Sequence, residues 1–96
     1  MKRDLVLSIL AAHREQLRSM GVGAIHLFGS VARGDDGPDS DVDLLADLEE
    51  RVGLIEFQDI QEFLAGILGC RVDLVPARSL KPRLRERVWK DAIRAA

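Results

Sequence analysis

Two polar elements attached to short apolar segments constrain this chain most. Gly29-Ser30 follows the apolar run at residues 24–28, and the alternating segment Asp41-Val42-Asp43-Leu44-Leu45 begins after ten more residues. Such alternation indicates a strand, in which every second residue shares a face. The Asp41 and Asp43 carboxylates therefore point the same way, with Cα atoms roughly 6.5–7 Å apart.

The residue types in these elements suit phosphate and a cation. A Gly-Ser turn at a strand end presents backbone N–H groups and a hydroxyl that suit phosphate oxygens. Two carboxylates so close together repel each other unless a cation lies between them. Mg²⁺ prefers a few carboxylates, water and the phosphate oxygens of a nucleotide. The pattern therefore predicts a site that transfers nucleotidyl groups.

A third carboxylate belongs to a later strand. In Arg71-Val72-Asp73-Leu74-Val75-Pro76, Asp73 takes the face opposite to Val72 and Leu74. If this strand lies beside the one that carries Asp41 and Asp43, the three carboxylates converge on one face and the apolar residues pack on the other. The alternative is that these are solvated surface residues flanking strands by chance.

The remaining patterns predict alternating helices and strands. Apolar residues at three- and four-residue spacing favour helices at about 3–20 and 53–68, the second ended by Gly69. Ser79 is a candidate N-cap for a last helix, with Pro82 in its first turn. Its expected inward-facing residues are Leu80, Leu84, Val88 and Ile93. With strands at about 24–28, 41–47 and 71–75, we predict an α/β architecture of the α+β type, with helices packed against a small mixed sheet of three or slightly more strands.

Length and charge limit the organisation. The 96 residues are expected to form one domain, residues 1–96. Residues 35–62 hold eleven acidic residues against one arginine, whereas residues 78–96 hold seven basic residues against two acidic ones. The acidic middle suits a cation site. The basic end suits nucleotide phosphates, an acidic partner, RNA, or a solvated helix face.

Individual residues support an intracellular setting. Cys70 is the single cysteine, which excludes an internal disulfide and favours a reducing cytoplasm. No stretch reaches transmembrane length, so no membrane partner is expected. His26 lacks a His or Cys partner at ligand spacing and is interpreted as a packed or edge residue. Trp89 is interpreted as core, with a partner contact as the alternative.

Three motifs follow one another along the chain: Phe28-Gly29-Ser30-Val31-Ala32-Arg33-Gly34, then Pro38-Asp39-Ser40-Asp41-Val42-Asp43-Leu44-Leu45, then residues 71–76. Together they resemble the signature of the DNA-polymerase-β-type nucleotidyltransferases, in particular the small prokaryotic branch of minimal nucleotidyltransferases. The resemblance covers nearly the whole chain. It implies that the strands lie in the order 1-2-3 with helices packed against them.

The resemblance also implies a two-metal mechanism with ATP. Asp41 and Asp43 would bind one Mg²⁺ at the β- and γ-phosphates, and would share with Asp73 a second Mg²⁺ at the α-phosphorus, with Mn²⁺ as a substitute. Asp73 would lie nearest the attacking hydroxyl and accept its proton.

Four further residues are candidates for the nucleotide side of the site. Gly29 would let the backbone approach the triphosphate, and Ser30 would donate its hydroxyl to a terminal phosphate. Arg33 would bind phosphate or instead pair with a nearby aspartate. Ser40 would cap the turn before the strand.

The same resemblance implies an acceptor and a partner. Because no acceptor-binding domain is visible in 96 residues, we expect another protein, not a nucleic acid, to supply the acceptor. Minimal nucleotidyltransferases are typically encoded beside a HEPN-domain ribonuclease toxin, and some transfer AMP from ATP to a tyrosine of that toxin. We therefore expect an antitoxin of this kind, in a hetero-oligomer with the toxin or a homo-oligomer. The alternatives are an idle module that neutralises its partner by binding alone, and transfer to a small molecule.

Overall fold

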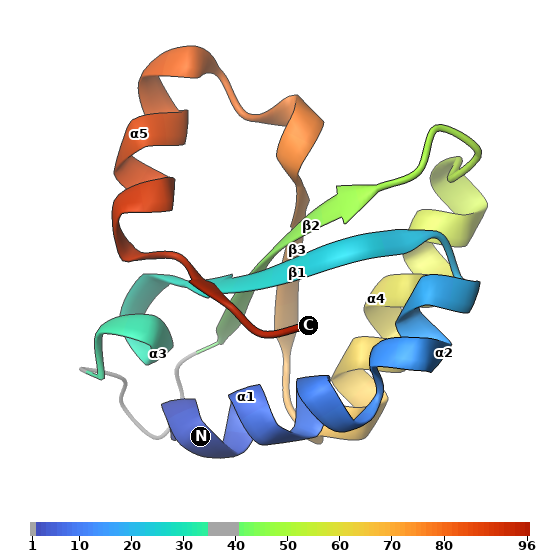
Figure 1. The fold of residues 1–96 in the computed structure, drawn as a ribbon, viewed down its shortest axis with the longest axis horizontal. Helices are drawn as coiled ribbons and strands as arrows, with labels where there is room; N and C mark the ends of the chain where they lie inside the picture. The colour runs from blue at the N-terminus through green and yellow to red at the C-terminus, as the bar shows by residue number, and fades with distance from the viewer. Residues whose placement is uncertain (1, 35–40) are drawn as a thin grey trace.

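A computed structural model describes residues 2–34 and 41–96 of the chain (Figure 1). Its centre is a four-stranded mixed sheet in the order β3-β2-β1-β4. The strands are β1 (Val22–Phe28), β2 (Val42–Leu48), β3 (Val72–Pro76) and β4 (Ile93–Arg94). β1 pairs antiparallel with β2 and β4, while β2 and β3 run parallel. The predicted α/β class with a small mixed sheet is confirmed, and the 1-2-3 order gains a fourth strand at the β1 edge.

The helices divide into two groups. They are α1 (Arg3–Ala12), α2 (Arg14–Ser19), α3 (Gly29–Arg33), α4 (Leu54–Leu68) and α5 (Pro82–Asp91), with a 3-10 turn, η1 (Ala77–Ser79), before the last. Figure 1 shows α1, α2 and α4 gathered together against the sheet, whereas α5 stands apart from them beside α3 and β1. The apolar residues of the first group form one core with the strands.

Strand alternation separates an apolar face from a polar one. On β2, Val42, Leu44 and Ala46 are fully buried in the core beneath the helices. Asp43 and Asp47 occupy alternate positions and so point to the opposite face. A one-residue slip would bury the carboxylates and expose the core residues, so the register is strongly determined.

Helix α4 follows its sequence pattern closely. Its buried residues Ile60, Leu64 and Leu68 recur every four positions along one stripe. The Gly53 N–H donates to Glu56 Oε1 at 3.1 Å, which satisfies one free donor at the helix start. Gly69 ends the helix with φ +66°, and its N–H donates to the Ala65 carbonyl at 2.8 Å, as predicted for a glycine C-cap.

The first predicted helix is two helices. His13 has φ −108° and ψ 18°, outside the helical region, and separates α1 from α2. Its Nδ1 lies 2.8 Å from the Ile9 carbonyl oxygen, and its backbone N–H donates to the Leu10 carbonyl at 3.1 Å. The break bends the chain so that each helix still has a residue buried against the sheet, Leu10 in α1 and Leu17 in α2.

The last helix departs further from its prediction. It begins at Pro82 with Lys81 as N-cap, while the Ser79 hydroxyl donates to the Pro76 carbonyl at 2.8 Å in the preceding turn. None of its residues is buried, so the expected inward stripe is wrong: Leu84 is 41% exposed, and Ile93 belongs to β4. Helix α5 packs mainly on β1 and on the five-residue helix α3, which offer little surface against which to bury such a stripe.

Candidate active site

Strands β2 and β3 bring two of the predicted carboxylates side by side. In their parallel pairing Asp43 is directly opposite Asp73, as Val42 is opposite Val72 and Leu44 opposite Leu74. Directly opposed residues on neighbouring strands share a face and lie within about 5 Å. Asp43 is half-buried on the inner strand β2, whereas Asp73 is exposed on the edge strand β3.

Gly29 lies immediately against Asp43. It follows Phe28, whose partner across β1 and β2 is Asp43, and it adopts φ +75°, in the left-handed region. A Cβ at this position would overlap Asp43 Oδ2 and would lie 3.1 Å from its Cγ and 3.2 Å from its Cβ. Only glycine combines that conformation with so close an approach to the carboxylate.

The electrostatics of this cluster favour a cation. Burial raises the pKa of Asp43 above its ordinary value, and the neighbouring Asp73 and Asp41 charges raise it further. The Arg33 guanidinium acts in the opposite direction and lowers this pKa. Three negative charges therefore act on one another around Asp43, and a cation among them would relieve the repulsion.

Asp41 is placed differently from the other two carboxylates. It is exposed, and its Oδ1 lies 3.7 Å from Arg71 Nε in an ion pair. Throughout residues 2–34 and 41–96, no three His, Cys, Asp or Glu side chains are arranged to hold one metal ion. The opposed pair of Asp43 and Asp73 still fits Mg²⁺ in donor chemistry, since Mg²⁺ is usually held by one or two carboxylates together with water and substrate phosphates.

The other predicted residues have distinct positions. Ser30 is half-buried in the first turn of α3, and Ser40 lies outside the described residues. Arg33 closes α3, and its Nη1 lies 3.6 Å from Asp91 Oδ2 of α5. The sequence alternatives for Arg33 were phosphate or a nearby aspartate. Asp91 is 58 positions away in the chain, which local spacing gave no means of finding, and the local aspartates Asp35, Asp36 and Asp39 lie outside the described residues.

Two hollows are lined by predicted site residues, one by Asp41 and Asp73 and the other by Gly29 and Arg33. One of about 420 Å³ is lined by Asp41, Asp73, Arg71 and the α4 residue Gln61, whose Nε2 donates to the Val72 carbonyl at 3.2 Å. The other, of about 440 Å³, lies between Gly29 and helix α5. The site is therefore open both on the α4 and β3 side and on the α3 and α5 side.

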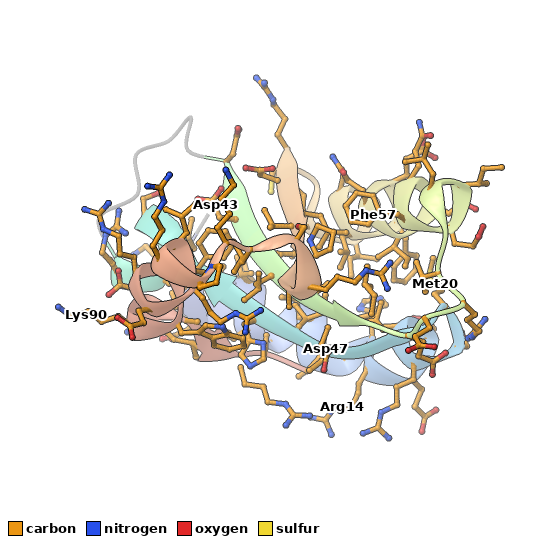
Figure 2. The ribbon with its side chains drawn as sticks, turned by 90° about the horizontal axis from the view of Figure 1, so that it is seen from above. Arg14, Met20, Asp43, Asp47, Phe57 and Lys90 are labelled. Carbon is orange, nitrogen blue, oxygen red and sulfur yellow. The ribbon has the colours of Figure 1, made fainter. Side chains whose placement is uncertain are left out.

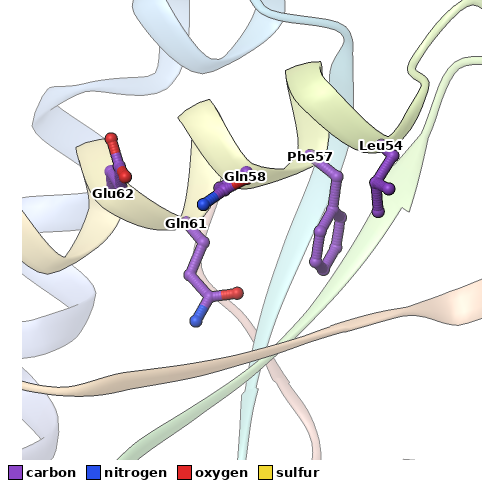
Figure 3. A pocket seen from close by; sticks show the side chains of 5 residues that line it. All are labelled: Leu54, Phe57, Gln58, Gln61 and Glu62. Carbon is purple, nitrogen blue, oxygen red and sulfur yellow. The ribbon is translucent and has the colours of Figure 1, made fainter.

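A further hollow lies along α4 (Figure 3). It is lined by Leu54, Phe57, Gln58, Gln61 and Glu62 and has a volume of about 400 Å³. It shares Gln61 with the hollow at Asp73, but none of the three predicted aspartates lines it. This hollow is thus separate from the predicted aspartates, and Figure 2 shows Asp43 well away from Phe57.

Comparison with known proteins explains this arrangement. The sequence profile of the nucleotidyltransferase domain matches residues 10–95. The chain belongs to the nucleotidyltransferase domain family. It is 45% identical over 87 residues to the protein adenylyltransferase MntA of Thermococcus cleftensis, covering 90% of this chain and 88% of that one.

Solved structures give the same result. A candidate minimal nucleotidyltransferase matches with a TM-score of 0.85 and 40% identity, covering 97% of this chain and 95% of the other. A toxin–antitoxin crystal structure with AMP-PNP matches with a TM-score of 0.72 and 27% identity, over 86% of this chain and 68% of the other. The chain is thus a nucleotidyltransferase with the minimal fold of that family. Within the described part, none of its helices is long and apolar enough to cross a membrane.

Proposed function

We propose that this nucleotidyltransferase is a Mg²⁺-dependent antitoxin that transfers AMP from ATP to a tyrosine of a HEPN-domain ribonuclease toxin. The observation that carries the reaction type is the opposition of Asp43 and Asp73, with Gly29 against Asp43. The 45% identity to a protein adenylyltransferase supports a protein as the acceptor. The likeness to a toxin–antitoxin structure that contains AMP-PNP supports a toxin partner and an adenine nucleotide.

The chain's own residues divide the work between donor and acceptor. Gly29 and Ser30 bind the triphosphate at the end of β1, next to the half-buried Asp43. Asp73, exposed on the edge strand, accepts the proton of the attacking tyrosine hydroxyl. The hydroxyl oxygen bonds to the α-phosphorus, the bond from that phosphorus to the bridging oxygen breaks, and pyrophosphate leaves.

Asp41, Asp43 and Asp73 are the residues that would hold Mg²⁺ or Mn²⁺. When bound, the metal supplies charge neutralisation for the phosphates and the leaving group. Asp41 would have to exchange its ion pair with Arg71 for this role, whereas Asp43 and Asp73 already lie opposite each other. Two ions are the number that the family resemblance implies.

The test is to incubate the HEPN protein encoded by the neighbouring gene with this chain, ATP and Mg²⁺, and to measure its intact mass and its RNA cleavage. We expect a gain of one or more AMP units on a tyrosine and a loss of nuclease activity. An added phosphate and base near the ribonuclease site would repel and obstruct RNA.

Asp43→Asn serves as the matched control, because it removes a charge with little change in shape. Under this proposal the variant leaves the partner's mass unchanged and its nuclease active. If nuclease activity falls without any mass change, and falls equally with Asp43→Asn, the chain neutralises its partner by binding alone and the transferase proposal is wrong.

A further inference from the structure

Helix α5 lies beside β1 on the face of the sheet that carries the carboxylates. His26 of β1 is opposite Leu45 of β2, and Leu45 has the same parity as Asp43, so His26 shares their face. The Trp89 ring packs edge-on against the His26 ring, with centroids 4.5 Å apart. This contact holds α5 on the reactive side of the sheet although the helix buries none of its residues.

A cavity between α5 and the Gly29 turn is rich in positive charge. It has a volume of about 440 Å³ and is lined by Arg33 of α3 and by Arg87 and Lys90 of α5, with Asp91 as the one acidic residue among the described residues that line it. Its floor includes Gly29 and the apolar side chains of Phe28 and Val88. Figure 2 shows Asp43 and Lys90 at the same end of the molecule.

The ion pair in this cavity leaves positive charge for a ligand. Arg33 Nη1 and Asp91 Oδ2 lie 3.6 Å apart, so the acidic residue found among the described lining residues is already engaged by one cation. Arg87 and Lys90 are exposed at the cavity and add two further positive charges beside the proposed triphosphate turn. Guanidinium and ammonium groups bind phosphate oxygens through charge-assisted hydrogen bonds.

We infer that Arg87 and Lys90 bind the terminal phosphates of the nucleoside triphosphate, so that α5 closes the donor side of the site. This inference rests on the proposed nucleotide site at Gly29 and extends it to a helix that the carboxylate motifs do not include. It also assigns the basic end of the chain to binding nucleotide phosphate rather than to an acidic partner, RNA or a solvated helix face. Residues 87 and 90 are one turn apart on the helix, and both line the same cavity. A helix face that is merely solvated would not need two basic residues at one cavity.

The experiment compares Arg87→Gln/Lys90→Gln with Arg85→Gln. Arg85 is the control because it lies on the same helix and is also exposed but does not line the cavity. Positions 85 and 87 point in directions about 200° apart around the helix axis. Binding of ATP, AMP and inorganic tripolyphosphate is measured with Mg²⁺ at low salt. Trp89 is the single tryptophan and no tyrosine is present, so its fluorescence reports directly on α5.

We expect the double variant to bind ATP and tripolyphosphate about five- to tenfold more weakly, since two partly exposed cation–phosphate contacts are lost. AMP, which lacks the terminal phosphates, should bind almost as it does to the wild type. Arg85→Gln should bind all three as the wild type does. Melting curves without nucleotide check that the exposed substitutions leave the fold intact.

Two results overturn the inference. One is wild-type affinity for ATP in the double variant. The other is an equal loss for AMP and ATP, which would place the cations at a different part of the nucleotide. If the wild-type chain binds no ATP at all, the proposed function itself fails, so the two failures are distinguishable.

Discussion

Replacing Gly29 by alanine tests how closely the phosphate turn and the carboxylate are coupled. The added Cβ meets a left-handed backbone, which costs an L-residue about 1–2 kcal/mol. It also overlaps Asp43 Oδ2 and lies 3.1 Å from Asp43 Cγ, so rotating the carboxyl group alone does not relieve the contact. The Asp43 carboxyl group must therefore shift, and its Cγ and Cβ must give by a few tenths of an ångström.

Gly34→Ala separates the two effects. Gly34 has φ +79°, close to the +75° of Gly29, but a Cβ there meets no atom of the described residues within 4 Å. Both variants should lose similar stability from backbone strain, with melting temperatures lowered by about 4–8 °C for each kcal/mol in a domain of this size. Only Gly29→Ala also moves Asp43, and a 1 Å misplacement can cost about 100-fold in rate.

The assay is thermal melting together with the initial rate of pyrophosphate release in the presence of ATP, Mg²⁺ and the acceptor protein. We expect the two melting temperatures to fall comparably and the rate to fall about 100-fold more in Gly29→Ala than in Gly34→Ala. Equal rates in the two variants would refute the reasoning, because they would show that the Gly29 approach to Asp43 has no part in the reaction.

Three further predictions concern single side chains. Ser30→Ala should weaken ATP binding by about 1.5–3 kcal/mol in calorimetry, the range for a hydrogen bond to a charged group, and leave the affinity for adenosine unchanged. The pKa of Asp43 is raised in the folded state, so the folded chain binds this proton more tightly than the unfolded chain does. Wild-type stability should therefore rise as the pH falls from the folded pKa toward the unfolded pKa. In urea melts, Asp43→Asn should be more stable than the wild type at neutral pH, and the difference should shrink on acidification. Burial, and to a lesser extent the Arg94 charge, lowers the pKa of His26 in the folded state. The unfolded chain therefore takes up this proton first as the pH drops, and stability should fall as the pH drops through about 6.5. His26→Gln should remove that part of the pH dependence, and an unchanged stability profile in this variant would contradict the prediction.

The positions of the carboxylates followed from the sequence because strand periodicity is a local property. Alternation alone put Asp43 and Asp73 opposite to the apolar residues of their strands, and the core residues Val42, Leu44 and Leu74 confirm that division. Their direct opposition needed one non-local fact, that β2 and β3 are neighbours. That fact came from the family resemblance and not from the spacing.

The parts that were missed depend on contacts distant in sequence. Nothing marks His13 as a break, since neither glycine nor proline is near it and the apolar periodicity continues to Leu17. Helix α5 carries apolar residues at helical spacing, but the chain offers it only a narrow place beside β1 and α3. Trp89 was interpreted as core and is 40% exposed, because its ring packs on His26 at the surface of the sheet.

Cys70 packs at the margin of the core. It is partly buried against the core, and burial raises the pKa of its thiol, which disfavours the thiolate. The acidic middle of the chain, residues 35–62, contributes Asp43 to the opposed pair, whereas Asp73 lies outside it. The positive charge of the last helix does not by itself indicate a ligand. The structure adds that two of its basic residues, Arg87 and Lys90, line the cavity beside Gly29.

The central claim is that Asp43 and Asp73 act as one unit in nucleotidyl transfer, and a double-mutant cycle tests it most directly. The transfer rate to the acceptor protein is measured for the wild type, Asp43→Asn, Asp73→Asn and the double variant under saturating ATP and Mg²⁺. Residues that work as a unit lose most of the rate with the first substitution, so the account predicts that each single variant is about as slow as the double variant. Losses that multiply in the double variant, or a wild-type rate in Asp73→Asn, would contradict it.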